Sequence, residues 1–462
     1  MGIEIHAFRT SELGNSAHVI IDRASGSAVV IDPARDIGEY LKLTDSEGVK
    51  MKWALETHVH NDFVSGAREL VAARDVRHGA SNNAGLKFPY EPLRDGDLIE
   101  VGSLLLRVLA TPGHTPEHIA YLLLDTNGEP TALFSGGTLM VGTAARNDLS
   151  GPALSWRFAH NLEQSLKEKI LPLPDEVVVY PTHGGGSFCA VGAGSAPSTT
   201  IGAERATNPL AQCVSSRQFV ARSLAAGTYP SYYARMRSLN QVGAPLIGPH
   251  TLMPPALVLA EFDSWVAQGA IVIDIRPAAA FRSSHIPASV AVGADGNLSG
   301  WVGWLFPPER PLVLIADAGE SGLIQIKEAT QQLARIGYDR VVGFLDGGIG
   351  TWTMVGRDTM SNETTNAAEL AKHLDAEELL VVIDVREAAE WHASHIPGSV
   401  NVPVHQIPTT ALDLPREIQL AVHCGHDYRG TLGGSLLERS GYRNLTIVED
   451  GWEGWTSLQE PI

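Results

Sequence analysis

Thr57-His58-Val59-His60-Asn61-Asp62-Phe63 directly follows an apolar run at residues 53–55, which predicts a buried strand. His58 and His60 are two residues apart on an extended chain end, so their side chains point the same way. Asp62 can turn back toward them. Zinc and non-haem iron both bind this mixture of imidazole and carboxylate. The alternative is a surface turn that contains two histidines by chance.

Three further loops in the first 245 residues carry polar side chains directly after predicted strands. They are Thr111-Pro-Gly-His114, Ser135-Gly-Gly-Thr138 and Pro181-Thr-His-Gly184. A lone histidine is usually structural, but binding sites lie at strand ends on rigid scaffolds, so several such loops indicate a metal site. Strands interleaved with helices, such as those expected at 37–47 and 65–73, predict two sheets with helices outside.

Length and composition limit the kind of protein. A chain of 462 residues favours about three domains. A net charge of −18 argues against a nucleic-acid partner or an anionic membrane. The three cysteines, Cys189, Cys213 and Cys424, are too few and odd in number for a disulfide framework, so a reducing compartment is expected. The first residues lack the apolar core of a signal peptide, which favours a cytoplasmic protein without a membrane partner.

An internal repeat fills the second half of the chain. Residues 271–276, IVIDIR, recur as VVIDVR at 381–386, and SHIPASV at 284–290 recurs as SHIPGSV at 394–400. Two copies of one domain of about 100 residues explain the repeat. Short apolar strands alternate with helices in each copy, which predicts a parallel sheet covered on both faces.

The second copy contains a cysteine where chemistry is expected. A strand at 420–423 runs into Cys424-Gly425-His426-Asp427-Tyr428-Arg429, and a helix follows at once. Backbone N–H groups and the positive end of the helix lower the pKa of a thiol placed there and stabilise an anionic persulfide. Arg429 adds a fixed cation. The alternative is a buried core cysteine with an arginine nearby.

The first copy has no cysteine. Its corresponding loop places either Glu320 or Asp317 at the cysteine position, depending on the loop length allowed. Neither side chain carries a sulfane sulfur, so we expect this copy to have a structural or docking role.

The first half resembles the metallo-β-lactamase fold, and in particular its persulfide dioxygenase branch. The resemblance rests on the four loops above and on residues 142–148, 184–189, 198–210 and 233–239. It implies an αββα sandwich over residues 1–248 and a single iron that oxidises a persulfide sulfur with O₂ to sulfite. By this resemblance His58 and His114 match the two iron histidines, and Arg146 contributes to substrate binding.

Two positions depart from the pattern of that family. Phe63 replaces the last histidine of HxHxDH, and Gly137 replaces the iron-binding aspartate of the SGDT loop. Fe(II) is therefore expected to bind weakly or not at all, with zinc as the alternative. A second set of candidate ligands is formed by residues that bind metal in two-metal hydrolases, namely His60, Asp62 and His183.

The two repeats resemble rhodanese through the CxxxxR loop, the Asp-Val-Arg strand and the His-Ile-Pro-Gly turn. The resemblance implies α/β domains with parallel sheets at residues 255–358, without cysteine, and 366–462, with Cys424. It implies that Cys424 carries the sulfur and Arg429 the charge of the loop. The residues implied to bind substrate are Gly425, His426, Asp427 and Tyr428. Asp427 stands where relatives often have glycine, and its carboxylate is expected to disfavour anionic acceptors.

The order of domains predicts sulfane-sulfur transfer through Cys424 in sulfide or persulfide metabolism. The donor would be a low-molecular-weight persulfide or thiosulfate, and the acceptor a thiol, sulfite or cyanide. The alternatives are an active persulfide dioxygenase–sulfurtransferase with altered metal coordination, a non-catalytic persulfide-binding protein, and a metal-dependent hydrolase. Cys189 lies six residues after His183 in a Gly-rich loop. It either meets a persulfide sulfur or, as we expect, is a buried structural thiol. A homo-oligomer is compatible with such a fusion.

Overall fold

The computed structural model describes residues 2–149, 151–190, 192–224, 227–248, 253–294, 296–377 and 379–458. The chain forms two compact units. Unit 1 comprises Met1–Leu252 with Gln331–Gly337, and unit 2 comprises Met253–Thr330 with Tyr338–Ile462. The predicted boundaries 1–248, 255–358 and 366–462 remain predictions, because this division keeps the two repeats together in one unit.

Unit 1 contains two six-stranded sheets, ordered β1-β2-β3-β4-β5-β6 and β12-β11-β10-β9-β8-β7. Their strands are β1 (Ile3–Thr10), β2 (Asn15–Asp22), β3 (Ser27–Ile31), β4 (Lys50–Leu55), β5 (Arg77–Ser81), β6 (Glu91–Leu93), β7 (Leu98–Val101), β8 (Leu104–Ala110), β9 (Ile119–Leu124), β10 (Pro130–Gly136), β11 (Val178–Pro181) and β12 (Thr199–Thr200). The first sheet is antiparallel from β1 to β3 and parallel from β3 to β6.

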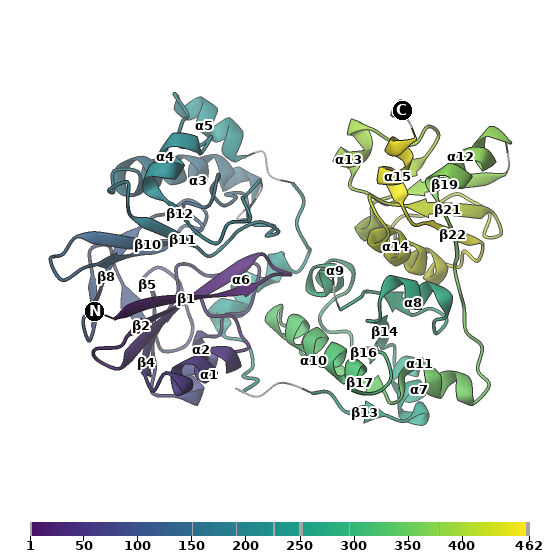
Figure 1. The fold of residues 1–462 in the computed structure, drawn as a ribbon, viewed down its shortest axis with the longest axis horizontal. Helices are drawn as coiled ribbons and strands as arrows, with labels where there is room; N and C mark the ends of the chain where they lie inside the picture. The colour runs from purple at the N-terminus through teal and green to yellow at the C-terminus, as the bar shows by residue number, and fades with distance from the viewer. Residues whose placement is uncertain are drawn as a thin grey trace. The chain divides into compact units, whose positions relative to one another are not determined.

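Helices of unit 1 pack against its two sheets and, for one of them, against the loop that carries His60 and Phe63. They are α1 (Gly38–Ser46), α2 (Ala67–Ala73), α3 (Pro152–Ser165), which continues into the π-helix η1 (Leu166–Ile170), α4 (Ile201–Thr207), α5 (Ser216–Ser223) and α6 (Tyr233–Val242). Figure 1 shows α1 and α2 on the first sheet and α3 and α4 on the second. The predicted αββα sandwich is confirmed, and the helices expected at 37–47 and 65–73 correspond to α1 and α2.

The core of unit 1 explains why its buried strands are continuous runs of apolar residues in the sequence. In β2, Ile20 faces the core between the sheets, together with Trp53 and Phe134. Its neighbours Val19 and Ile21 face the layer under α1 and α2. Because successive side chains of a strand point to opposite faces, both faces must be apolar when both are covered.

Unit 2 contains two five-stranded sheets, ordered β13-β17-β16-β14-β15 and β18-β22-β21-β19-β20. Every pair of strands is parallel, as the repeat predicted. The first sheet consists of β13 (Ala256–Leu257), β14 (Ile271–Asp274), β15 (Val290–Ala291), β16 (Leu312–Ile315) and β17 (Val341–Leu345). The second consists of β18 (Glu363–Thr365), β19 (Leu380–Asp384), β20 (Val400–Asn401), β21 (Gln419–His423) and β22 (Leu445–Val448).

The helices of unit 2 follow the strands in the same order in both repeats. The first repeat has α7 (Leu259–Ala267), α8 (Ala278–Ser283), α9 (Leu298–Leu305), α10 (Glu320–Arg335) and α11 (Gly348–Met354). The second has α12 (Ala367–Asp375), α13 (Ala388–Ala393), the 3₁₀ turn η2 (Val404–Gln406), α14 (Tyr428–Arg439) and α15 (Gly451–Ser457). Among the helices of the described residues, none has both the length and the apolar character needed to cross a membrane.

Candidate functional site

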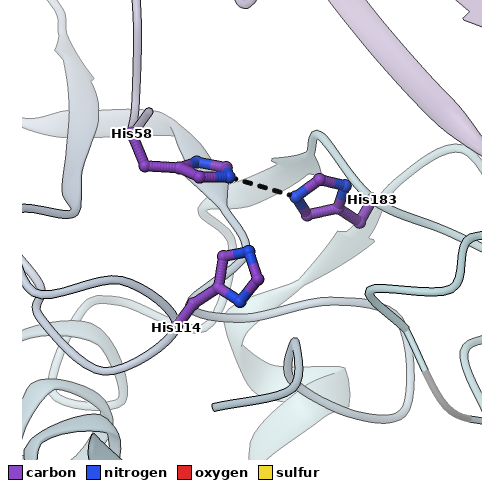
Figure 2. A group of neighbouring side chains, drawn as sticks. All are labelled: His58, His114 and His183. Carbon is purple, nitrogen blue, oxygen red and sulfur yellow. Dashed lines mark hydrogen bonds between the residues drawn. The ribbon is translucent and has the colours of Figure 1, made fainter. Parts of the chain in front are cut away.

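Three histidines from three loops lie together in unit 1. His58 follows β4, His114 follows β8 and His183 follows β11, and all three are buried. Figure 2 shows their rings arranged around one centre. One ligand nitrogen from each lies within 4.8 Å of those of the other two. The structure therefore brings together His183 with the two histidines that the sequence matched to an iron site.

Hydrogen bonds determine which nitrogen of each ring carries the proton. Nδ1 of His114 lies 2.5 Å from the carbonyl oxygen of Arg146, which only accepts. Nδ1 of His183 lies 2.9 Å from Oδ1 of Asn15, whose Nδ2 donates to Asp62. Each of these two rings therefore donates from Nδ1 and turns an Nε2 lone pair toward the centre.

His58 follows the same rule. Its Nδ1 lies 2.9 Å from the hydroxyl oxygen of Thr57, and that hydroxyl donates its own proton to Asp32 at 2.7 Å. Nε2 of His58 and Nε2 of His183 are 3.3 Å apart, and Nε2 of His114 has no hydrogen-bond partner. Three lone pairs directed at one point form a ready site for a cation.

Burial keeps these rings in the neutral form that binds metals. Desolvation, reinforced by the neighbouring histidines, lowers the pKa of His58 well below its usual value. Desolvation and His183 lower the pKa of His114 to about 3. Three neutral imidazoles with an open fourth position match the ligand pattern of catalytic zinc, and imidazole also suits Fe(II). The residues present therefore fit the metal that this kind of fold implies.

The imidazole of His60 is paired with a buried carboxylate. Its Nε2 lies 3.2 Å from Oδ1 of Asp32. Although burial opposes the charged form, the Asp32 carboxylate outweighs it and raises the pKa of His60 to about 9. The ring stacks on Phe63 with centroids 4.1 Å apart. His60 also belongs to two further groups that could hold a metal ion, one with Asp32 and His58 and one with Asp62 and His183.

Asp32 is the residue that sequence reasoning missed. It follows β3 with a positive φ of 50° and is buried. Burial opposes its ionisation, but His60 and the hydroxyls of Thr182 and Thr57 outweigh that effect and lower the pKa of Asp32 to about 2. The signal in the sequence was its place at a strand end, like the four loops that were identified.

Asp62 lies behind His183. Its Oδ2 accepts from Nδ2 of Asn15 at 2.7 Å and lies 3.3 Å from Nδ1 of His183. Burial opposes ionisation, yet His183 outweighs it and holds the pKa of Asp62 below its usual value. Its carboxylate thus orients a histidine in the way that metal sites use an outer carboxylate.

The backbone at Gly137 leaves little room for a side chain. A Cβ there would lie 2.8 Å from Cβ of Ala145 and 2.8 Å from Cδ2 of His114. Its N–H donates to Nε2 of His118 at 3.0 Å, a buried histidine that the sequence analysis did not single out. Nδ1 of His118 contacts the hydroxyl of Thr111, so this ring braces the loop beside the histidine centre.

Arg146 and Cys189 are both enclosed. The guanidinium of Arg146 donates to Asp148 at 2.6 and 2.7 Å and lies over the ring of Tyr229, and its own carbonyl holds His114. The side chain of Arg146 is therefore already engaged in contacts that fix a loop. Its role in substrate binding stays a prediction. Sγ of Cys189 lies 4.0 Å from the hydroxyl of Tyr233, and burial raises the pKa of the Cys189 thiol well above its usual value.

The second candidate site lies in unit 2, where β21 ends and α14 begins. Cys424 is fully buried at this junction. Backbone N–H groups of Gly430, His426 and Arg429 are directed at its sulfur and, with the Arg429 charge, favour the thiolate. Burial outweighs them and raises the pKa of Cys424. The expected lowering of this pKa is therefore wrong for the closed loop, because the sequence does not reveal how completely the thiol is desolvated.

Arg429 does not act as a free cation. It donates to both carboxylate oxygens of Glu390 on α13, at 2.7 and 2.9 Å. Sequence reasoning did not connect these residues. The pair divides the positive charge of Arg429 between the thiol and a carboxylate.

The four residues implied to bind substrate form the loop around Cys424. Gly425 and Tyr428 are half-buried, His426 is exposed, and Asp427 has a φ of 42° that is rare outside glycine. The carbonyls of Cys424 and Gly425 accept from Trp452 and Glu453 at the start of α15. A Cβ at Gly451 would lie 2.4 Å from the Cys424 carbonyl oxygen, so this close approach needs glycine.

The corresponding loop of the first repeat is closed by its own side chains. The Asp317 N–H donates to Gln325 at 3.0 Å, and the amide of Gln325 donates back to the Asp317 carboxylate at 2.8 Å. Glu320 begins α10. These contacts agree with a loop that carries no sulfur.

Family models match both the N-terminal half of the chain and the two repeats that follow it. The Metallo-beta-lactamase superfamily matches residues 12–183, and the Rhodanese-like domain matches residues 258–354 and 366–458. A metallo-beta-lactamase from Staphylococcus aureus subsp. aureus COL is 30% identical with a TM-score of 0.65, over 74% of this chain and 99% of that one. The chain belongs to the metallo-beta-lactamase superfamily. It continues with two rhodanese-like domains.

Two of the curated relatives match two fifths of this chain or less. A hydroxyacylglutathione hydrolase from Rhodopseudomonas palustris (strain BisB18) is 34% identical over 185 residues, which is 40% of this chain and 67% of the relative. The persulfide dioxygenase ETHE1 of Bos taurus is 30% identical over 171 residues, 36% of this chain and 62% of the relative. The chain thus spans about two thirds or less of the length of these two proteins.

The three-histidine centre predicts metal uptake that depends on His183. We expect the chain to bind about one Zn²⁺ or Fe(II) in unit 1, and His183→Ala to weaken that binding at least about tenfold, because a direct ligand is lost. Metal titration followed by elemental analysis measures this. His160→Ala, which removes a partly exposed histidine on α3, should leave binding unchanged. Equal affinity in His183→Ala and the parent would show that His183 is not a ligand.

The raised pKa of Cys424 predicts a reaction rate that climbs with pH. The thiolate is the nucleophile, so alkylation of Cys424 by iodoacetamide should increase as pH rises through 9, the ordinary value for this thiol. Glu390→Gln removes the carboxylate that shares the Arg429 charge, and should shift the profile to lower pH. Peptide mass spectrometry follows Cys424 alone. Glu369→Gln, at an exposed pair with Lys372, is the control; identical profiles for Glu390→Gln and the parent contradict the argument.

Proposed function

We propose that this chain transfers sulfane sulfur in sulfide or persulfide metabolism, with Cys424 as the sulfur carrier. The observation that carries the proposal is the place of the buried Cys424 between the end of β21 and the start of α14, where backbone N–H groups and the Arg429 charge favour its thiolate. Fixed donors aimed at the place where negative charge develops are the usual means of stabilising an anionic group. A terminal persulfide sulfur is such a group.

The reaction needs only the thiol and two sulfur compounds. The Cys424 thiolate attacks the outer sulfur of thiosulfate, its S–S bond breaks, and sulfite leaves with the bonding electron pair. Cys424 then carries a persulfide. An acceptor such as cyanide, sulfite or a thiol attacks the terminal sulfur, the Cys–S–S bond breaks, and the Cys424 thiolate is restored. A low-molecular-weight persulfide can replace thiosulfate as donor.

The loop residues have distinct parts in this proposal. Arg429 and the N–H groups stabilise the charge on sulfur, and Glu390 fixes Arg429. The exposed side chain of His426 and the half-buried Gly425 and Tyr428 line the approach to the sulfur. Cys189 and Cys213 are buried in unit 1 and take no part.

A second candidate function is favoured by the three-histidine centre. The domain around it resembles a persulfide dioxygenase, and fusing two sites raises the local concentration of an intermediate that passes between them. Bound Fe(II) would activate O₂, with the persulfide sulfur supplying the electrons, and bound Zn²⁺ would supply a Lewis acid. The chain itself supplies Nε2 of His58, His114 and His183, with Asp62 and Asn15 orienting the last. A non-catalytic persulfide-binding domain and a metal-dependent hydrolase are the other outcomes.

The sulfur-transfer proposal predicts the result of replacing the Cys424 sulfur with oxygen. Cys424→Ser should lower thiosulfate:cyanide transfer by about a thousandfold or more, since the nucleophile is lost. Thiocyanate formation measures the rate, and mass spectrometry of thiosulfate-treated protein should show one added sulfur on Cys424. Cys213→Ser should retain full activity. Transfer that survives in Cys424→Ser, or none in the parent, refutes the proposal.

The second candidate predicts oxygen uptake. Iron-loaded protein supplied with glutathione persulfide should consume O₂ if the three-histidine centre supports oxidation, and His114→Ala should abolish the uptake because a ligand is missing. An oxygen electrode measures this while Cys424→Ser serves as the matched control, since it leaves unit 1 unchanged. Metal-loaded protein that consumes no O₂ and cleaves no thioester would leave unit 1 as a binding domain.

A further inference from the structure

The loop around Cys424 contains a residue held in an unfavourable conformation. Asp427 precedes α14 with φ 42° and ψ −70°, a region that residues with a Cβ seldom adopt. Such a conformation costs free energy and persists only where neighbouring groups hold it in place. The loop that presents the N–H groups to Cys424 therefore depends on something that holds Asp427.

The group that holds Asp427 belongs to the other rhodanese-like domain. Arg282 on α8 donates from one nitrogen to the Asp427 carboxylate and to the hydroxyl of Thr431, the latter at 2.9 Å. Its second nitrogen donates to Glu449 at 2.7 Å. The side chain of Arg282 is only 6% exposed, whereas those of Asp427 and Glu449 are 33% and 48% exposed.

Backbone hydrogen bonds also join the same three partners of Arg282. The Asp427 N–H donates to the Glu449 carbonyl at 3.0 Å, and the Thr431 N–H donates to the Asp427 carbonyl at 3.1 Å. Arg282 thus connects the loop, the first turn of α14 and the end of β22 in one network. A planar guanidinium with several donors suits such a junction better than an ammonium does.

A second contact fixes α8 to the helix that follows the cysteine. Nε2 of His285 lies 2.9 Å from Glu438 on α14, and the N–H of Ala288 donates to the same carboxylate at 3.1 Å. Both side chains of this pair are buried. The first rhodanese-like domain therefore contacts α14 near both of its ends.

Comparison of the two repeats shows that only the first has an arginine at this position. By the offset of 110 residues, the position of Arg282 in the second domain is His392, and the position of His285 is His395. Nδ1 of His395 bonds the carbonyl of Trp391, just as His285 bonds that of Phe281. The local turn is kept in both copies, whereas the arginine exists only in the copy that lacks a cysteine.

We propose that Arg282 is a positioning residue for sulfur transfer, which holds Asp427 in place and offsets part of its charge, so that the Cys424 loop accepts an anionic sulfur donor. This inference rests on the proposed function of Cys424. It gives the cysteine-free domain a defined task, because its α8 completes the active loop of the neighbouring domain. It also revises the expectation that the Asp427 carboxylate disfavours anions, since its pairing with Arg282 weakens its electrostatic repulsion of them.

The test compares two electrophiles that differ in charge. Iodoacetate and iodoacetamide alkylate a thiolate by the same displacement, so the ratio of their rates at Cys424 reports the local potential, while loop opening affects both alike. In Arg282→Gln the ratio should fall about 3- to 10-fold at low ionic strength, because Asp427 is left with an uncompensated charge. The fall should shrink in about 1 M salt.

Second-site variants separate charge from folding. Adding Asp427→Asn to Arg282→Gln should restore the ratio, and adding Asp427→Gly should also restore the absolute rates, because glycine adopts a positive φ without strain. Arg282→Lys should keep the ratio. Arg357→Gln, which breaks an ion pair with Asp263, is the control and should change nothing. In steady-state transfer, Arg282→Gln should raise KM for thiosulfate more than it lowers kcat.

The outcomes distinguish this inference from the function on which it rests. An unchanged ratio in Arg282→Gln, or a fall that Asp427→Asn does not reverse, would overturn the role of Arg282. A parent protein that shows the expected ratios but no sulfur transfer would refute the proposed function and leave the pairing of Arg282 with Asp427 intact. Alkylation needs no sulfur donor, so it is measured in either case.

Discussion

One buried carboxylate, Asp32, holds the N-terminal site together. It accepts from the backbone N–H and the hydroxyl of Thr57 at 2.7 Å, and from the hydroxyl of Thr182. These residues belong to the loops that carry His58 and His183. Because an unpaired charge in a protein interior costs several kcal/mol, each of these donors is required, and the loops are fixed relative to one another as a consequence. The positions of the histidines follow from that constraint.

The same carboxylate also affects the protonation of two histidines. It keeps His60 protonated, and through the Thr57 hydroxyl it directs the proton of His58 to Nδ1. The Arg146 carbonyl and Asn15 do the same for His114 and His183. Three neutral nitrogens and one cation therefore arise from residues of the same type, because their hydrogen-bond partners differ.

The two rhodanese-like domains show how a duplicated fold divides its tasks. Both keep the Asp-Arg pair at the end of the first long strand, Asp274 with Arg276 and Asp384 with Arg386, with nearly equal geometry. They differ at the helix that follows the central strand. In one, a thiol lies under backbone N–H groups; in the other, Asp317 and Gln325 close the loop. The domain without the thiol places Arg282 against the Cys424 loop of the domain that has it.

The sequence by itself determined the fold class, the repeat, the loops at the strand ends and the cysteine at the head of a helix. These features are local: alternation, apolar runs and turn residues specify strands and loops within a few residues. Tertiary structure decided the charge states. Arg429 meets Glu390 across 39 residues, and Arg282 meets Asp427 across 145. Burial of Cys424 raises its pKa where the loop alone would lower it. Charge depends on desolvation and on distant partners, and neither is encoded in the spacing of neighbouring residues, so only the folded chain shows which groups are ionised and which can react.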